Sequence, residues 1–149
     1  MAENLAFNAG TGTYGQGYED RWGYLYTWEA ANIAVPDGWY LATKAEWDEL
    51  IMDIGGAEAA ADKLKDIASG DWTNQQSTDD SNSSGFSALP AGRYSYGTSG
   101  YDNRNQIGFW WTADEFTNDM AWNFWIEGSP VIVDKEFKTK GLSVRCVKD

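Results

Sequence analysis

The sequence predicts an α+β fold, because two segments have helical periodicity and most others have strand-like alternation or turn chemistry. The helical segments lie in the middle of the chain, and the strand-like segments gather in its last third, from Ile107 to Asp149. A chain of 149 residues suits one domain with a sizeable core. We therefore expect a single domain over residues 1–149, with two helices packed on small antiparallel sheets and joined by long irregular loops.

The amino-terminal part is predicted to consist of short strands and turns. A short strand is expected at Asn4 to Phe7, and the aromatic run from Trp22 to Trp28 is strand-like and leads into a brief helical turn. Pro36-Asp37-Gly38 is typical of a turn, since proline fixes φ and glycine accepts positive φ. Another short strand, Trp39 to Leu41, should follow this turn.

Two adjacent helices are predicted in the middle. Thr43 and Glu46 have the spacing of a capping box, in which each side chain binds a backbone amide of the first turn. The first helix then carries an apolar stripe of Trp47, Leu50, Ile51 and Ile54. Gly55-Gly56 should end it, and a second helix is expected from Ala57 to Ile67.

Polar loops separate these helices from the last third. Residues from Ser69 to Ser84 are almost all polar, a composition that disfavours a packed core of their own. Tyr94 and Tyr96 suggest a strand, and Ser99 to Asn105 reads as an exposed turn.

The last third alternates with period two, so one face of each strand can be buried. The inward sets are Ile107, Phe109 and Trp111, then Trp122, Phe124 and Ile126, then Leu142, Val144 and Cys146. This leaves Asn123 and Trp125 on the opposite face, beside the polar turn between the first two strands. Polar turns on a rigid sheet are frequent sites of binding residues. An alternative is that Trp125 covers a second core layer and Phe116 folds under its own loop.

Composition excludes several classes of function. The formal charge is −12 and the eleven Lys and Arg are scattered, which argues against a nucleic-acid partner. The sequence has no histidine and one cysteine, Cys146, which is predicted to be a buried hydrophobe, so His-assisted nucleophiles and multi-Cys metal sites are excluded. No apolar run reaches the roughly 20 residues that a membrane-spanning helix needs, so we expect no membrane insertion.

Acidic residues offer two further possibilities. The pairs Asp79-Asp80 and Asp114-Glu115 could act in hydrolysis, but adjacent acids on polar loops are usually solvated charge. Asp79, Asp80 and Asn82, or Asp114, Asn118 and Asp119, could supply oxygen ligands to calcium. We expect a domain without catalytic activity and without a cofactor, and leave calcium as an open possibility.

Several segments resemble a known family. They are MAENL, WGYLYTWEAA, PDGWYLATKAEWDEL, GFSALPAG, FWWTADE, AW and GLSVRCV, which resemble the Fibrobacter succinogenes major paralogous domain in that family's order over nearly the whole chain. The resemblance implies a C-type-lectin-like fold. Because MAENL typically follows a tryptophan in the family, it also implies that this domain is part of a longer parent chain.

The sequence departs from the family at positions that matter for function. Val35, Tyr40 and Ala42 stand where the family commonly has Cys, His and Pro, which is consistent with a Cys146 that forms no disulfide. The family's Trp-Ser-Ser-Thr-Glu segment reads here as residues 111–115, Trp-Thr-Ala-Asp-Glu. These changes fall in the polar turn described above.

The resemblance implies recognition. Many such domains belong to secreted or surface proteins of bacteria, and related lectin-like domains are variable receptors of diversity-generating retroelements, which enrich Asn, Asp, Tyr and Ser near the carboxyl end. Ordinary turn chemistry enriches the same residues, so both explanations stay open. We expect binding of a protein or glycan at a site made of Tyr101, Asp102, Asn103, Asp114, Phe116, Asn118, Asp119, Asn123 and Trp125. The alternative is a structural module of a bacterial surface or phage virion protein without a specific ligand.

The family motifs are assigned to structure. Their aromatic and apolar members should be core, namely Trp28, Trp39, Trp47, Phe86, Leu89, Trp111 and Trp122. Gly38, Gly92 and Gly141 should occupy positions that need backbone freedom, and Arg145 should pair with a carboxylate or carbonyl inside the fold.

Overall fold

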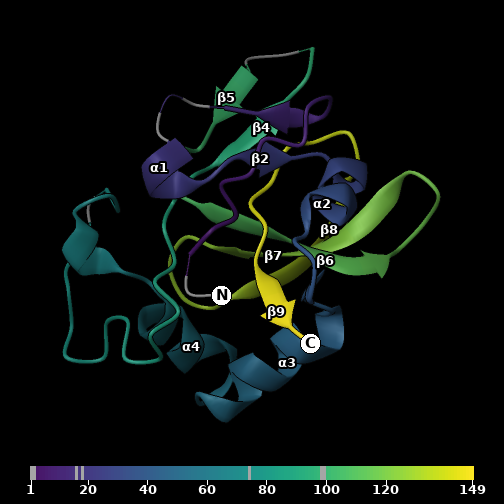
Figure 1. Ribbon diagram of the computed structural model, residues 1–149. Coiled ribbons are helices and arrows are strands. Elements are labelled where there is room, and N and C mark those ends of the chain that lie inside the picture. The colour runs from purple at the N-terminus through teal and green to yellow at the C-terminus, as the bar shows by residue number, and fades with distance from the viewer. Residues whose placement is uncertain (1–2, 16, 18, 74, 98–99) are drawn as a thin grey trace.

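The computed structural model describes residues 3–15, 17, 19–73, 75–97 and 100–149 (Figure 1). Over these residues the fold is α+β, as predicted. The helices are α1 (Glu19–Trp22), α2 (Trp28–Ala34), α3 (Lys44–Asp53), α4 (Gly56–Leu64) and a 3-10 helix, η1 (Ile67–Ser69). The strands are β1 (Thr13–Tyr14), β2 (Leu25–Tyr26), β3 (Trp39–Leu41), β4 (Arg93–Ser95), β5 (Gly100–Asp102), β6 (Gly108–Glu115), β7 (Met120–Ile126), β8 (Ile132–Phe137) and β9 (Cys146–Lys148).

A three-stranded antiparallel sheet, β6-β7-β8, is the centre of the fold. The antiparallel pairs β1-β2, β3-β9 and β4-β5 surround it. Figure 1 shows α3 and α4 on one side of the central sheet, with β1, β2, β4 and β5 towards the opposite end of the molecule. The first described residues lie along the carboxyl-terminal segment, since Leu5 N–H donates to the Val144 carbonyl at 3.0 Å.

Strand β6 of the central sheet is buried on both faces, which the alternation alone did not predict. Trp110 joins the cluster beneath α3 and α4, whereas Phe109 and Trp111 join a second cluster with α2 and residues 142–146. Each face is covered by a different layer, so both sets of alternating side chains are removed from water. The expected inward residues of β6 are therefore buried, and so is Trp110 opposite them.

The two predicted helices are confirmed. Thr43 Oγ1 accepts from the Glu46 N–H, and the Glu46 carboxylate accepts from the Thr43 N–H at 2.8 Å, which completes the capping box. Trp47 stacks on Phe124 of the sheet, with ring centres 5.0 Å apart. The second helix is shorter than expected and ends at Leu64. Asp66 N–H then donates to the Ala88 carbonyl at 3.0 Å. This hydrogen bond joins the chain to a distant segment, so the helix does not continue.

Two amino-terminal strand predictions were wrong: the first strand does not form, and the second is shorter than predicted. Asn4 to Phe7 forms no strand, because its groups bond to separated partners and not to one neighbouring strand. The run from Trp22 to Trp28 contains only β2, with α1 before it and α2 after it. Gly23 has φ 73°, which ends α1, and Thr27 Oγ1 accepts from the Ala30 N–H, which begins α2. Local turn and cap chemistry therefore overrides strand propensity here.

Trp122 and Asn123 lie differently from the prediction. Phe124 and Ile126 are buried as expected, but Trp122 is only half-buried. The Trp122 ring makes an edge-to-face contact with Phe116, with ring centres 5.1 Å apart. The ammonium of Lys44, the first residue of α3, lies 5.4 Å from the Trp122 ring centre. Trp122 is therefore at the edge of the helix layer, where cover is incomplete. Asn123, expected at the surface, is only 3% exposed.

The remaining core assignments are confirmed in part. Trp47 and Trp111 are buried, whereas four others are half-buried. Trp28, Trp39 and Phe86 pack against the two clusters, and Leu89 packs against a third cluster made of Trp22, Leu25 and Ala91. Trp72 in the polar loop is also buried. Its indole N–H donates to the Ala88 carbonyl at 3.1 Å, and this contact anchors the loop.

Two predicted structural roles are confirmed. Gly38 and Gly92 have φ of 78° and 70°, and a Cβ on Gly92 would lie 2.2 Å from the Asp102 carbonyl oxygen. Gly141 does not have positive φ, but a Cβ there would lie 2.9 Å from side-chain atoms of Tyr14 and Tyr94. Arg145 is buried and donates to the Asn4 side-chain oxygen at 2.8 Å and to the Ser87 carbonyl at 2.9 Å. Part of the predicted turn at Ser99 to Asn105 is strand β5, which pairs with β4, while Ser99 lies outside the described residues.

Candidate functional site

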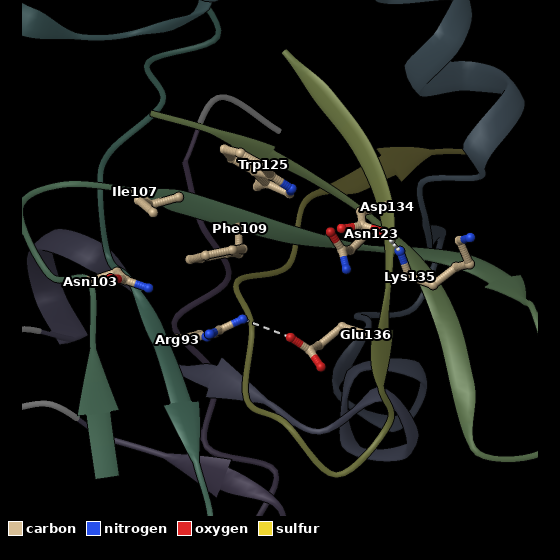
Figure 2. A pocket seen from close by; sticks show the side chains of 9 residues that line it. All are labelled: Arg93, Asn103, Ile107, Phe109, Asn123, Trp125, Asp134, Lys135 and Glu136. Atoms are coloured by element: carbon tan, nitrogen blue, oxygen red, sulfur yellow. Dashed lines mark hydrogen bonds and ion pairs between the residues drawn. The ribbon is translucent and has the colours of Figure 1, made fainter. Parts of the chain in front are cut away.

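A cleft of about 230 Å³ opens between the β4-β5 hairpin and the central sheet. Figure 2 shows it with β4 and β5 below and the sheet strands above. The residues that line it come from five separate places in the chain: Arg93, Asn103, Ile107, Phe109, Asn123, Trp125, Asp134, Lys135 and Glu136. The cleft thus exists only because the hairpin folds back onto the sheet.

An aromatic pair forms one wall. Phe109 of β6 lies opposite Trp125 of β7 in the register, which puts both side chains on one face of the sheet. Their ring centres are 6.3 Å apart at an interplanar angle of 40°. Phe109 is buried, whereas Trp125 is half-buried and keeps part of its indole open to the cleft. An aromatic surface of this kind can stack against a flat, apolar or cationic group.

Two ion pairs of Arg93 close one side of the cleft. The Arg93 guanidinium binds the Asp102 carboxylate at 3.0 Å and the Glu136 carboxylate at 2.8 Å, and its centre lies 5.2 Å from the Phe109 ring centre. Figure 2 shows Arg93 and Glu136 reaching towards each other across the cleft. All three charged side chains are less than a third exposed. These contacts fix the hairpin to β8 and leave the Arg93 charge already neutralised.

Asn123 has a buried amide that the fold does not use. The residue is 3% exposed, and its Oδ1 accepts no hydrogen bond from any residue that the structure describes. Buried side-chain polar atoms nearly always have a partner, because an unsatisfied one costs stability. Asn123 lines the cleft, beside Asp134 on the neighbouring strand. An unpartnered acceptor therefore lies within the wall of the cleft, where its oxygen atom is closed to solvent.

The Asp134 carboxylate is available. It accepts from the Lys135 backbone N–H at 2.8 Å, is exposed, and forms no ion pair with any described residue. The Lys135 ammonium does not neutralise it, because this group lies on the other face of the sheet, 4.9 Å from the ring centre of Phe116. Figure 2 shows the Lys135 side chain directed away from the cleft.

The predicted residues of the β6-β7 turn lie elsewhere and take part in the fold. The Asp114 carboxylate accepts from the backbone N–H of Lys44 at 2.6 Å, which caps α3. Phe116 is 45% exposed and packs on Trp122. Asn118 and Asp119 are exposed, and their backbone carbonyls accept hydrogen bonds from Lys138 at 3.0 and 2.9 Å.

Of the three predicted binding residues around β5, one lines the cleft and the other two make contacts within the fold. Tyr101 packs against Tyr94 with ring centres 5.0 Å apart, and its hydroxyl donates to the Gly15 carbonyl. Asp102 holds Arg93 from behind, and Asn103 lines the cleft with φ 57°, a conformation that asparagine tolerates. The structure therefore brings together Asn103, Asn123 and Trp125, with Asp102 behind them.

Sequence reasoning missed the charged members of the cleft. Asp134 and Glu136 share one face of β8, and their spacing of two could have identified a polar strand face. No local signal connects them to Arg93, because the Arg93–Glu136 pair joins residues 43 positions apart. That contact depends on the packing of the hairpin against the sheet.

The other reactive groups are engaged or buried. Cys146 is 1% exposed, and burial raises the pKa of its thiol to about 11. Glu115 forms an ion pair with Lys138, and Asp79 and Asp80 lie exposed on the 69–84 loop. Across the described residues, no three His, Cys, Asp or Glu side chains gather as a metal site would need. In the same part of the chain, no helix combines the length and apolarity required to cross a bilayer.

The comparisons with known proteins identify the family. No curated protein and no solved structure matches the chain. The family model of the Fibrobacter succinogenes major domain matches residues 2–148, nearly the whole sequence, which confirms the resemblance of the motifs. The chain therefore belongs to the Fibrobacter succinogenes major domain family.

Proposed function

We propose that this chain is a non-catalytic recognition domain that binds a protein or glycan ligand in the cleft between the β4-β5 hairpin and the central sheet. One observation carries the proposal. Asn123 presents a buried, unpartnered acceptor at the wall of the cleft, beside the partly open indole of Trp125. A polar group left unsatisfied by its own fold lowers stability, and such groups persist at functional sites.

The chemistry of the other side chains supports recognition without catalysis. The two adjacent carboxylate pairs serve other roles or are solvated: Asp114 caps α3 and Glu115 pairs with Lys138, while Asp79 and Asp80 are exposed on a loop. Cys146 is buried with a raised thiol pKa, so its nucleophilic thiolate form is disfavoured at neutral pH.

The proposal extends to fold family and location. A C-type-lectin-like fold is supported by the two helices on the antiparallel sheet, by the long loops, and by amino- and carboxyl-terminal segments that lie side by side. We place the domain on a bacterial surface protein as part of a longer chain, with a phage virion protein as the alternative. A retroelement that diversifies the region from Tyr101 to Glu127 is part of the same proposal.

A binding screen tests the proposal. The wild-type domain and the Trp125→Ala variant would be compared on arrays of glycans and of bacterial surface proteins. We expect ligands that the wild type retains and Trp125→Ala loses. Phe137→Ala is the matched control, because Phe137 is an aromatic residue of the same sheet, 52% exposed and outside the cleft. Ligands that bind all three proteins equally would refute the cleft as the site.

Natural variation gives a second test, specific to the retroelement. The gene would be sequenced in many sibling isolates, and amino-acid changes would be scored by position. Changes concentrated between Tyr101 and Glu127, with the family motifs fixed, would support a diversified receptor. Changes spread evenly over exposed positions would remove the retroelement from the proposal.

A structural module remains the second candidate, favoured by a separate observation. Ile33 and Tyr96 are 76% and 77% exposed and line a hollow of about 410 Å³ with Tyr14 and Ala30. Exposed apolar side chains gathered in this way are typical of a contact surface. If no array ligand depends on the cleft, this surface would be the next to test.

A further inference from the structure

We propose that the cleft receives a basic side chain of a protein partner, arginine in preference to lysine. This inference rests on the proposed function and deepens it by naming the ligand chemistry. It depends on which interactions at the cleft are already satisfied and which are open.

The charged groups of the cleft carry an excess of negative charge. Among the described residues, Arg93 is the one cation whose charged group faces it, since the Lys135 ammonium lies on the other face of the sheet. Against Arg93 stand three carboxylates, those of Asp102, Asp134 and Glu136. Two of these already bind Arg93, so the Asp134 carboxylate is the one left to attract a ligand cation.

The accessible acceptor of the cleft that has no ion-pair partner among the described residues is the Asp134 carboxylate, whereas the unpartnered Asn123 Oδ1 is closed to solvent. Asn123 Oδ1 and the Asp134 carboxylate lie on adjacent strands, since Asn123 and Asp134 are partners in the β7-β8 register. Directly opposed residues on one face of an antiparallel pair have Cβ atoms roughly 4.5–5.5 Å apart. A guanidinium is a planar fork of five N–H donors and has no acceptor, which suits the exposed Asp134 carboxylate.

The aromatic wall favours the same ligand. The exposed part of the Trp125 indole can stack against a guanidinium plane, and Trp is the best aromatic partner of cations. Phe109 already stacks against Arg93 in this way, with the guanidinium centre 5.2 Å from its ring centre. At about 230 Å³ the cleft suits one side chain better than a large molecule. The net charge of −12 would steer a basic partner towards the domain.

A titration with a matched pair of small probes tests the inference. N-acetyl-arginine methylamide and N-acetyl-citrulline methylamide have nearly the same shape, but only the first is charged. Each would be added to the ¹⁵N-labelled domain while the Trp125 indole N–H and the Asn123 side-chain amide signals are followed by NMR. We expect the arginine probe to shift both signals and to bind about tenfold more tightly than the citrulline probe, as for a hydrogen bond to a charged group.

Asp134→Asn should remove this preference. The substitution keeps the side-chain oxygen that accepts from the Lys135 N–H and removes the charge. The arginine probe should then bind as weakly as citrulline, about tenfold below its wild-type affinity. Asp79→Asn is the matched control, because it removes one charge from the exposed 69–84 loop, away from the cleft, and should leave both affinities unchanged.

Three results would overturn the inference, and they differ in what they say about recognition. If citrulline binds as tightly as arginine, or if Asp134→Asn leaves the arginine affinity unchanged, charge does not select the ligand. If neutral methyl glycosides shift the two signals and the arginine probe does not, the cleft is a glycan site and the recognition proposal stands. If no probe shifts them, the basic ligand is excluded, and the array screen decides on recognition separately.

Discussion

The two ends of the β6-β7 hairpin have similar residue types and different roles. At the turn end, Asp114 caps α3 and Phe116 packs on Trp122, so these side chains are used by the fold. At the cleft end, Asn123 keeps an unpartnered acceptor and Trp125 keeps part of its ring open. Composition favours both ends equally as a binding surface. The difference teaches that a recognition site is better found by its unsatisfied groups than by its residue types.

The largest loss of unfolding free energy is expected from a substitution in the core. Trp47 is 2% exposed and packs against Phe86, Phe124 and Trp110. Trp47→Ala should lower the free energy of unfolding by about 3–5 kcal/mol, through lost transfer energy and the cavity left behind. Urea unfolding followed by circular dichroism measures the loss. A decrease below about 1 kcal/mol would mean that the helix layer contributes little to stability.

The turn end should respond to a loss of capping. Asp114→Ala removes the carboxylate that accepts from the first backbone N–H of α3, and should cost about 1 kcal/mol of unfolding free energy. Ligands found in the array screen should still bind. Loss of a ligand without any change in stability would instead make Asp114 a recognition residue.

At the cleft end we expect the reverse result: stability is kept or raised, and ligand binding is weakened. Asn123→Leu replaces an unsatisfied buried amide with an apolar group of similar shape, so the unfolding free energy should stay constant or rise by up to about 1 kcal/mol. Binding of cleft ligands should fall, because the unpartnered amide that lines the cleft is gone. Urea unfolding and the NMR titration would be measured on the same sample.

Asn4 is the matched control for this substitution. It is 8% exposed, and its amide is fully used, with bonds to the Trp22 carbonyl and from the Trp110 indole and Arg145. Asn4→Leu should lower the unfolding free energy by more than about 2 kcal/mol, because it leaves the buried Arg145 guanidinium without one of its acceptors. If Asn4→Leu and Asn123→Leu had equal effects, Asn123 would be structural and the cleft would lose its main support.

The smallest effect is expected at the tip of the turn. Asn118 and Asp119 are exposed, and the contacts of the tip to Lys138 come from their backbone carbonyls. Replacing both with alanine should change the unfolding free energy by less than about 0.5 kcal/mol and should leave cleft ligands bound. If ligand binding is lost, the turn end and not the cleft carries recognition, and the comparison is reversed.

Much of the fold could be predicted locally. The capping box of Thr43 and Glu46 and the apolar stripe of α3 depend on spacings of three and four residues, and both are confirmed. The site could be predicted only in part. Asn103, Asn123 and Trp125 reach the cleft, but Arg93 and Glu136 were missed, because their pairing depends on a contact between a hairpin and a strand far apart in the sequence.

The sequence by itself determined the α+β class, the two central helices, the alternation of β7 and the family, because these follow from short-range periodicity and from motifs in order along the chain. Tertiary structure alone decided which alternating faces are covered. It buried both faces of β6, left Trp122 at the edge of the helix layer, and enclosed Asn123. The physical reason is that periodicity tells which side chains share a face, whereas burial depends on which distant layer packs against that face.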